Sequence, residues 1–271
     1  MIMDTVNVDQ TGSVARLKGR LGGKLQAQQS RPVDERKMPS MKETELSVST
    51  SGFVALNNNA LELISKNLKH QQLTHSLFDV IKAPSGGSTV FLVPGLAGDE
   101  AQKELSGIIL DYNTPRAYWD TPDPVEGTPP VCQSRDSIIS DDGKPCVRCQ
   151  YNTFGSKDGE SNAKACKESV ELFLLRQDNV MPVIVRIPVS SKLLFQKYMT
   201  RLIGRIIPLS GVVTKITLER ATSKTGQPYA LYNFEAVSML SSQEAASARN
   251  FAQKFMEILN AGDQPEMPEA V

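Results

Sequence analysis

Seven short runs rich in β-branched and aromatic residues dominate the chain after residue 75, and turn residues separate them. Such runs are typical of strands. Turn residues join neighbouring runs at Asp178–Asn179 and in KTGQ at 224–227, and the Gly86–Gly87 turn is expected to close a hairpin. The predicted strands cover residues 76–84, 88–95, 106–113, 168–178, 181–190, 211–223 and 228–239.

Three further segments repeat their apolar residues at helical spacing. One of the serines at 190–191 is expected to cap the second helix. One of the serines at 241–242, with Glu244 near the capping-box position, predicts the start of the third helix, and Gly262 predicts its end. The predicted helices cover residues 60–70, 192–206 and 242–262.

These helices are too few to cover both faces of a parallel sheet. We therefore expect a mainly β, α+β fold, built on an antiparallel barrel or twisted sheet with peripheral helices. The expected divisions are a flexible N-terminal arm over 1–50, a β domain over 51–262 and an acidic C-terminal tail over 263–271. An insertion without regular periodicity occupies about 114–166 of the β domain.

The length of 271 residues suits one elaborated β domain or two average domains. Apolar residues make up 40% and charged residues 22%, values that exclude collagen, coiled coils and wholesale disorder. Apolar stretches stay shorter than the ~20 residues of a spanning helix, and the N-terminus lacks the apolar core of a secretory signal. We therefore expect a cytoplasmic protein.

The formal net charge is zero, but the charges are segregated along the chain. Residues 1–160 carry 17 Lys and Arg against 20 Asp and Glu, whereas residues 161–259 carry 13 against 7. Between 182 and 232 the single acid Glu219 faces eight basic residues. A basic segment of this kind suggests a polyanion as partner, and a solvated basic face is the plainer interpretation.

The insertion contains all four cysteines of the chain. Cys146 and Cys149 form a Cys-x-x-Cys pair, with Cys132 before it and Cys166 after it. Two thiolates of such a pair can reach one ion, and two more complete the closed tetrahedral shell of a structural Zn²⁺ site. A metal would also order a segment that lacks an apolar core. Disulfides and a thioredoxin-like redox pair fit the expected compartment and the surrounding turns less well.

Four thiolates fill the coordination shell of zinc, so a catalytic role of the metal is not expected. The sequence also lacks phosphate-binding, nucleophile-elbow, zinc-protease and dinucleotide motifs. Asp136, Asp141 and Asp142 could imitate the carboxylate cluster of a metal-dependent nuclease, although acids in such segments are more often turn formers.

Basic and aromatic residues occur together in the second half of the chain, as in grooves that neutralise phosphates and stack on bases. Single aromatic residues of this kind more often belong to a core. The candidate nucleic-acid-binding residues are Arg116, Tyr118, Trp119, Arg148, Tyr151, Phe154, Lys157, Lys197, Arg201, Arg205, Lys215, Arg220, Lys224, Tyr229 and Tyr232.

The stretch CQSRDSIISDDGKPCVRCQYNTFGS, followed by KACKE, ELFLL, PVIVRIPVSS, a helix and VVTKITLE, resembles proteins of bacteriophages and mobile elements that accompany replication and recombination genes. The resemblance covers about 107–240. It also extends to phage single-stranded-DNA-binding proteins, which implies an OB-type barrel with a zinc-bearing insertion and a groove for single strands. The long N-terminal region and a tail without a dense Asp run or terminal Phe depart from that pattern.

The leading hypothesis is a non-enzymatic, zinc-stabilised single-stranded-DNA-binding protein that acts in phage or mobile-element DNA replication or recombination in a bacterial host cell. A second hypothesis is a protein-interaction regulator of a recombinase or polymerase, similar to recombination directionality factors. The third is the metal-dependent nuclease. Salt-sensitive binding with little sequence preference would distinguish the first from the others.

Overall fold

The structure is a computed structural model of the chain. It describes residues 48–49, 52–56, 60–69, 71–82, 85–121, 124–125, 127–159, 162–177, 179–224 and 226–262. The predicted arm, apart from strand β1 (Val48–Ser49), and the predicted acidic tail lie outside the described residues. All of the described residues belong to one compact unit.

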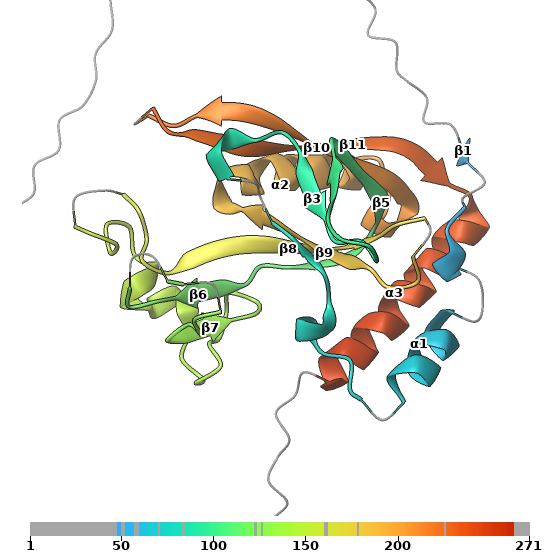
Figure 1. The fold of residues 1–271 in the computed structure, drawn as a ribbon, viewed down its shortest axis with the longest axis horizontal. Coiled ribbons are helices and arrows are strands. Elements are labelled where there is room, and N and C mark those ends of the chain that lie inside the picture. Colours follow the sequence, from blue (N-terminus) through green and yellow to red (C-terminus); the bar gives the residue numbers. More distant parts are fainter. Residues whose placement is uncertain are drawn as a thin grey trace, which may run out of the picture. The chain divides into compact units, whose positions relative to one another are not determined.

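A curled mixed sheet forms the body of the protein, in the shape of a half-barrel (Figure 1). Its strand order is β1-β11-β10-β5-β8-β6-β7, with β9 paired to both β8 and β2, while β3 and β4 form a separate pair. The remaining strands are β2 (Val80–Ile81), β3 (Phe91–Val93), β4 (Glu100–Gln102), β5 (Glu104–Asn113), β6 (Arg116–Tyr118), β7 (Cys132–Ser134), β8 (Lys167–Leu175), β9 (Val183–Pro188), β10 (Val212–Thr222) and β11 (Pro228–Leu240).

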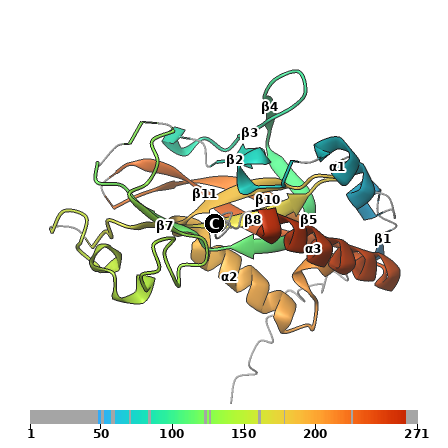
Figure 2. The same cartoon turned by 90° about the horizontal axis from the view of Figure 1, so that it is seen from below.

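Three α-helices cover the two faces of this sheet in the described part of the chain: α1 (Ala60–Leu68), α2 (Val189–Ile203) and α3 (Ser242–Gly262). Helix α2 packs on one face against β11, β8 and β9, and α1 and α3 pack on the other (Figure 2). Among the described residues, no helix is long and apolar enough to cross a membrane.

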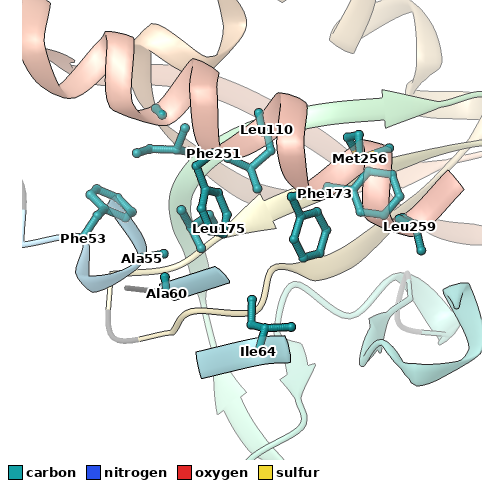
Figure 3. Packing of buried hydrophobic residues seen from close by; sticks show 14 of the residues in the cluster. Phe53, Ala55, Ala60, Ile64, Leu110, Phe173, Leu175, Phe251, Met256 and Leu259 are labelled. Carbon is teal, nitrogen blue, oxygen red and sulfur yellow. The ribbon is translucent and has the colours of Figure 1, made fainter. Parts of the chain in front are cut away.

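Strand β8 divides the interior into two apolar cores. Leu172 and Leu174 enter the core beneath α2, whereas Phe173 and Leu175 enter the core formed with α1 and α3 (Figure 3). Successive residues of a strand point to opposite faces, and both faces of β8 are covered, so all four side chains are fully buried. The unbroken apolar run LFLL at 172–175 is therefore the pattern of a central strand that is covered on both sides.

The sheet curls where β5 crosses between β10 and β8. A side chain at Gly107 would place its Cβ 2.4 Å from the carbonyl oxygen of Leu175, a distance that no non-bonded carbon tolerates. A bulge between Ile109 and Asp111 then shifts the register against β8. Bulges increase local twist, so the glycine and the bulge together explain how the strand can bend at this point.

The capping box predicted for the last helix is confirmed. The Glu244 carboxylate accepts hydrogen bonds from the backbone N–H and the hydroxyl of Ser241, and the Ser241 hydroxyl accepts one from the Glu244 N–H. Gly262 ends the helix as predicted, and a Cβ there would lie 2.1 Å from the Leu73 carbonyl oxygen.

The serine cap predicted for α2 is wrong. The helix begins at Val189 after Pro188, and Ser191 lies inside it, fully buried. The Ser191 hydroxyl instead accepts a hydrogen bond of 3.0 Å from the Tyr232 backbone N–H, so it joins the helix to strand β11. Ser191, which the local pattern assigns to a cap, is therefore used in a contact between distant parts of the chain.

The hairpin expected at Gly86–Gly87 is also wrong. Strand β2 before the turn joins β9 in parallel, and β3 after it pairs with β4. Strand β4 lies in the charged segment for which no strand is predicted. These strands have two or three residues each, too few for local sequence to determine their partners. The mainly β class with peripheral helices is confirmed, but the sheet is mixed rather than wholly antiparallel.

The insertion over 114–166 is attached to one end of the sheet, away from α1 and α3 (Figures 1 and 2). Strand β6 pairs with β8 and with β7, which extends the sheet into the insertion. Two 3₁₀ turns, Cys146–Arg148 and Gln150–Asn152, follow. The buried residues in the described part of the insertion are Ser134, Ser140 and Cys146, so this part has no apolar core of its own.

Candidate functional site

The four cysteines come from four separate places in the insertion. Cys132 begins β7, Cys146 opens a 3₁₀ turn, Cys149 follows that turn, and Cys166 immediately precedes β8. Backbone hydrogen bonds fix two of these places: Cys149 N–H donates to the Cys146 carbonyl at 3.3 Å, and Cys166 N–H donates to the Tyr151 carbonyl at 2.8 Å. All four are free thiols.

These turns bring all four cysteines to the lining of one cavity of about 170 Å³. Polar residues complete the wall, among them Arg116, Ser140, Asp142 and Lys144. In the part of the chain that the structure describes, no three Cys, His, Asp or Glu side chains stand close enough to hold a metal ion as they are placed. The cysteines therefore surround a common space without meeting inside it.

Burial raises the pKa of the Cys132 and Cys166 thiols. Asp142 raises the pKa of Cys132 further, whereas the nearby Arg116 guanidinium opposes the increase at Cys166. Each of the two thiols also interacts electrostatically with Cys146 and Cys149. The raised pKa favours the neutral thiol at Cys132 and Cys166.

Arg116 connects this cavity to the body of the protein. Its Nη2 lies 2.6 Å from Glu168 Oε2, its Nη1 donates to Asn152 Oδ1 at 2.6 Å, and its side chain is only 11% exposed. Its Nε is buried and has no hydrogen-bond partner among the described residues. The sequence predicts that Arg116 contacts nucleic acid; in the structure its charge is balanced by the internal Glu168 carboxylate and its side chain is mostly buried.

A second, larger and open cavity of about 660 Å³ lies on the other side of β6 and β7. Both strands line it together with β8, β9 and the segment around His75. Trp119 stands in its wall, half-buried, and its indole N–H donates to the Thr128 carbonyl at 2.9 Å. The Lys167 ammonium lies 5.9 Å from the centre of the Trp119 ring. We call this cavity the Trp119 groove.

Positive charge predominates in the Trp119 groove. Glu168 and Glu171 are the two carboxylates of its lining, against Arg116, Arg135, Lys167 and Arg186. Arg186 Nη2 lies 2.5 Å from Glu171 Oε1, and Glu168 is paired with both Arg116 and Lys192. Both acids of the groove are thus neutralised from within the protein.

The remaining candidates of the insertion lie outside the groove. Tyr118 stacks on Tyr151, with ring centres 3.8 Å apart and planes 11° from parallel, so these rings occupy one another's faces. Phe154 is 78% exposed, and the Lys164 ammonium lies 4.6 Å from its ring centre. The exposed basic candidates of the insertion, Arg148 and Lys157, also lie outside the groove lining.

The candidates of α2 and of the β10–β11 hairpin differ in exposure. Lys215 forms an ion pair of 2.8 Å with Glu235, and Tyr229 is half-buried. Tyr232 is fully buried in the core beneath α2, where its ring meets Phe91 edge-on, so its prediction as a stacking residue is wrong. The other basic candidates of this part are exposed: Lys197, Arg201, Arg205, Arg220 and Lys224.

The sheet separates the exposed face of α2 from the Trp119 groove. Helix α2 packs on the face that carries Leu172 and Val185, whereas the groove is lined by Glu171, Ile184 and Arg186. Neighbouring residues of a strand point to opposite faces, so these are two sides of one sheet. The predicted basic residues therefore form separate patches and do not line a single track.

The three aspartates of the nuclease hypothesis serve turns. Asp136 Oδ1 accepts hydrogen bonds from the Ile138 N–H at 2.7 Å and the Ile139 N–H at 3.2 Å, which lowers the pKa of the carboxyl. Asp141 accepts one from the Gln133 amide, and Asp142 pairs with Lys144. This is the arrangement of turn formers, and within the described residues these carboxylates do not converge as a metal-binding cluster.

The sequence prediction omits Arg135, Lys167 and Arg186, which line the Trp119 groove. Lys167 lies next to a predicted strand and Arg186 lies inside one. In both strands the apolar pattern indicates the core rather than a charged surface. Arg135 stands three residues after Cys132, so proximity to a predicted metal ligand is the signal that could have found it.

Comparison with protein-family models, with curated proteins and with solved structures gives no match for this chain. The resemblance to phage and mobile-element proteins stays a prediction from the sequence.

Proposed function

We propose that the protein binds single-stranded nucleic acid, DNA in the first place, in the Trp119 groove and catalyses no reaction on it. The observation that carries this proposal is the composition of the groove: one half-exposed indole, a lysine beside its face and a surplus of cationic side chains. Following the sequence resemblance, we assign this binding to phage or mobile-element DNA replication or recombination.

The groove offers the two interactions that hold an unpaired strand. Aromatic faces stack on exposed bases with little regard to sequence, worth ~1–3 kcal/mol per base. Lysine and arginine neutralise phosphates and release counterions, which makes binding salt-dependent. Trp119 supplies the first, the Lys167 ammonium lies 5.9 Å from its ring centre, and Arg135 lines the same groove.

Internal pairing of the acids favours an anionic ligand. Arg186 and Arg116 compensate Glu171 and Glu168, so neither acid presents unbalanced negative charge to a phosphate. Lys192 adds a further positive charge at Glu168 from the start of α2. A backbone that follows the groove therefore meets lysine and arginine without the repulsion of free carboxylates.

Fluorescence of Trp119, the only tryptophan of the chain, measures binding directly. Oligo-dT, oligo-U and duplex DNA are each titrated into the full chain at about 50 and 200 mM salt. We expect quenching by oligo-dT that weakens steeply at the higher salt concentration. Labelled oligonucleotides give the affinities of variants that lack the indole.

Paired variants separate stacking from folding. Trp119→Leu should weaken oligo-dT binding about 5- to 100-fold, whereas Trp119→Phe keeps a stacking face and should bind more tightly than the leucine variant. Phe154→Leu tests the competing assignment, since Phe154 is an exposed aromatic candidate outside the groove, and loss of binding in this variant with retention in Trp119→Leu would contradict stacking in the groove. Lys167→Glu should weaken binding and flatten the salt dependence, and Lys254→Glu on α3 should not.

Absence of binding to every nucleic acid tested would overturn the proposal. Equal affinities of Trp119→Leu and the unaltered protein would also overturn the assignment to this groove. The first of these outcomes would make a protein partner the leading hypothesis.

A further inference from the structure

We propose that Cys132, Cys146, Cys149 and Cys166 form a structural Zn²⁺ centre that orders the insertion and supports the wall of the Trp119 groove. Metal binding is independent of the nucleic-acid proposal. The supporting role rests on it, because the wall in question belongs to that groove.

The donor set fits zinc. Four cysteines that line one cavity supply four thiolates, the ligand number and type of a closed tetrahedral site. Zn–S bonds of ~2.3 Å would bring the sulfurs to about 3.8 Å from one another. As placed, no three of the possible ligands in the described residues can hold one ion, so convergence requires rotation of the cysteine side chains and movement of the loops that carry them.

The architecture of the insertion calls for a link of this kind. Its buried side chains in the described part are two serines and one of the four cysteines. Several of its large apolar side chains are exposed, among them Val131, Ile138 and Val147, so burial of apolar surface contributes less than in the β domain. Metal binding supplies folding free energy where apolar burial does not.

Arg116 provides a second, independent pointer to bound thiolates. Its buried Nε–H has no acceptor in the part of the chain that the structure describes, yet the side chain lines the cysteine cavity and interacts electrostatically with Cys166. A metal-bound thiolate is an acceptor for such a donor, as outer-shell hydrogen bonds are for metal ligands generally. Lys144 lines the same cavity, where its charge is paired with Asp142.

The same residues connect the proposed centre to the Trp119 groove. Arg116, Gln133 and Ser134 line both cavities, so β6 and β7 are the partition between them. Cys132 lies on β7 and is paired in register with Tyr118 of β6. A metal bound to Cys132 would therefore fix the strand that forms one wall of the groove.

Metal analysis of the full chain, purified without added zinc and then reconstituted, tests the centre. We expect one zinc ion per chain, and cobalt substitution should give the visible bands and thiolate charge-transfer absorption of a tetrahedral site. Single Cys→Ser variants at 132, 146, 149 and 166 should each lose tight binding and the tetrahedral cobalt spectrum.

Asp142→Asn is the matched control, because Asp142 also lines the cavity and its carboxylate could replace a thiolate. We expect this variant to keep a full equivalent of zinc and an unchanged cobalt spectrum. Loss of metal in Asp142→Asn with retention in one Cys→Ser variant would overturn the four-cysteine set. A reduced, reconstituted chain without zinc would overturn the centre altogether.

A variant that fails to fold is recognised by circular dichroism, because the β domain has two cores outside the insertion. Chelation of the unaltered protein provides the measurement that needs no variant. We expect chelation to weaken oligo-dT binding at least several-fold. Addition of zinc should then restore the oligo-dT affinity. If the chain binds zinc but chelation leaves the oligo-dT affinity unchanged, the supporting role alone is overturned. If the chain binds one zinc ion but no nucleic acid, only the proposed function is contradicted.

Discussion

In the β domain, successive residues of β8 enter two different apolar cores, whereas the buried residues in the described part of the insertion are two serines and a cysteine. The first region is held by apolar surface that is removed from water. The second is held by hydrogen bonds within turns, such as those from Ser134 to Asp136 and to the Ile139 carbonyl. Such bonds each contribute only ~1 kcal/mol net, so the insertion needs another source of order.

The boundary between the two regions is the pairing of β6 with β8. Arg116 joins the two regions, since its guanidinium donates to Glu168 of the β domain and to Asn152 of the insertion. Because the two regions rely on different interactions, changes in one should be separable from changes in the other.

Truncation of a core side chain should have the largest effect. Phe173→Ala removes a fully buried ring that meets Phe78 edge-on, and we expect a loss of ~3–5 kcal/mol in the free energy of unfolding. Val147→Ala in the insertion removes an 81% exposed side chain and should change it by less than about 0.5 kcal/mol. Urea unfolding followed by circular dichroism measures both, and equal losses would contradict the contrast between the regions.

Loss of the junction should come next. Arg116→Ala leaves Glu168 with Lys192 as its remaining ion-pair partner in a poorly exposed place, and we expect a loss of about 3 kcal/mol in unfolding free energy. The double variant Arg116→Met with Glu168→Leu removes both charges and should be more stable than Arg116→Ala. A double-mutant cycle without coupling would show that the pair does not join the regions.

Removal of the helix cap should have a smaller effect, confined to the β domain. Ser241→Ala loses the hydroxyl that accepts the Glu244 N–H, with an expected cost of ~1 kcal/mol. Ser241→Thr keeps an acceptor and serves as the control. Hydrogen exchange should accelerate at the start of α3 and stay unchanged in the insertion, and acceleration in the insertion would contradict the separation.

The smallest effect should come from pH and be confined to the insertion. Backbone N–H donors at Ile138 and Ile139 lower the pKa of Asp136 below its value in an unfolded chain. Its stabilisation is therefore fully present above about pH 4 and is lost as the pH falls through the lowered pKa. The protection of the Ile138 and Ile139 amides, measured against the intrinsic exchange rate at each pH, should fall there, and Asp136→Asn should abolish this pH dependence. Persistence of the pH dependence in Asp136→Asn would contradict the assignment.

Much of the fold can be predicted from local sequence. The run ELFLL predicts a strand, and Ser241 with Glu244 predicts the start of the last helix, because both signals act within a few residues. The partners of β2 and β3 cannot be predicted in this way, since two- or three-residue strands are selected by the surfaces that receive them. The role of Ser191 likewise depends on Tyr232, which lies 41 positions away.

The candidate site can be predicted from sequence only in part. The four cysteines line one cavity, because short turns keep them close, and the metal site expected from their spacing stays a prediction. The ion pair of Arg116 cannot be predicted, since Glu168 is 52 positions away, and neither can the burial of Tyr232. Charge patterns identify basic residues, but the faces of the sheet decide which of them lie together.

Hydrogen exchange of the full chain, with and without a zinc chelator, tests most directly whether a metal replaces the missing core of the insertion. We expect accelerated exchange over 114–166 on chelation, unchanged exchange in β8, β10 and α3, and recovery on addition of zinc. Unchanged exchange in the insertion after complete removal of metal, or acceleration spread equally over both regions, would show that no metal takes the place of that core.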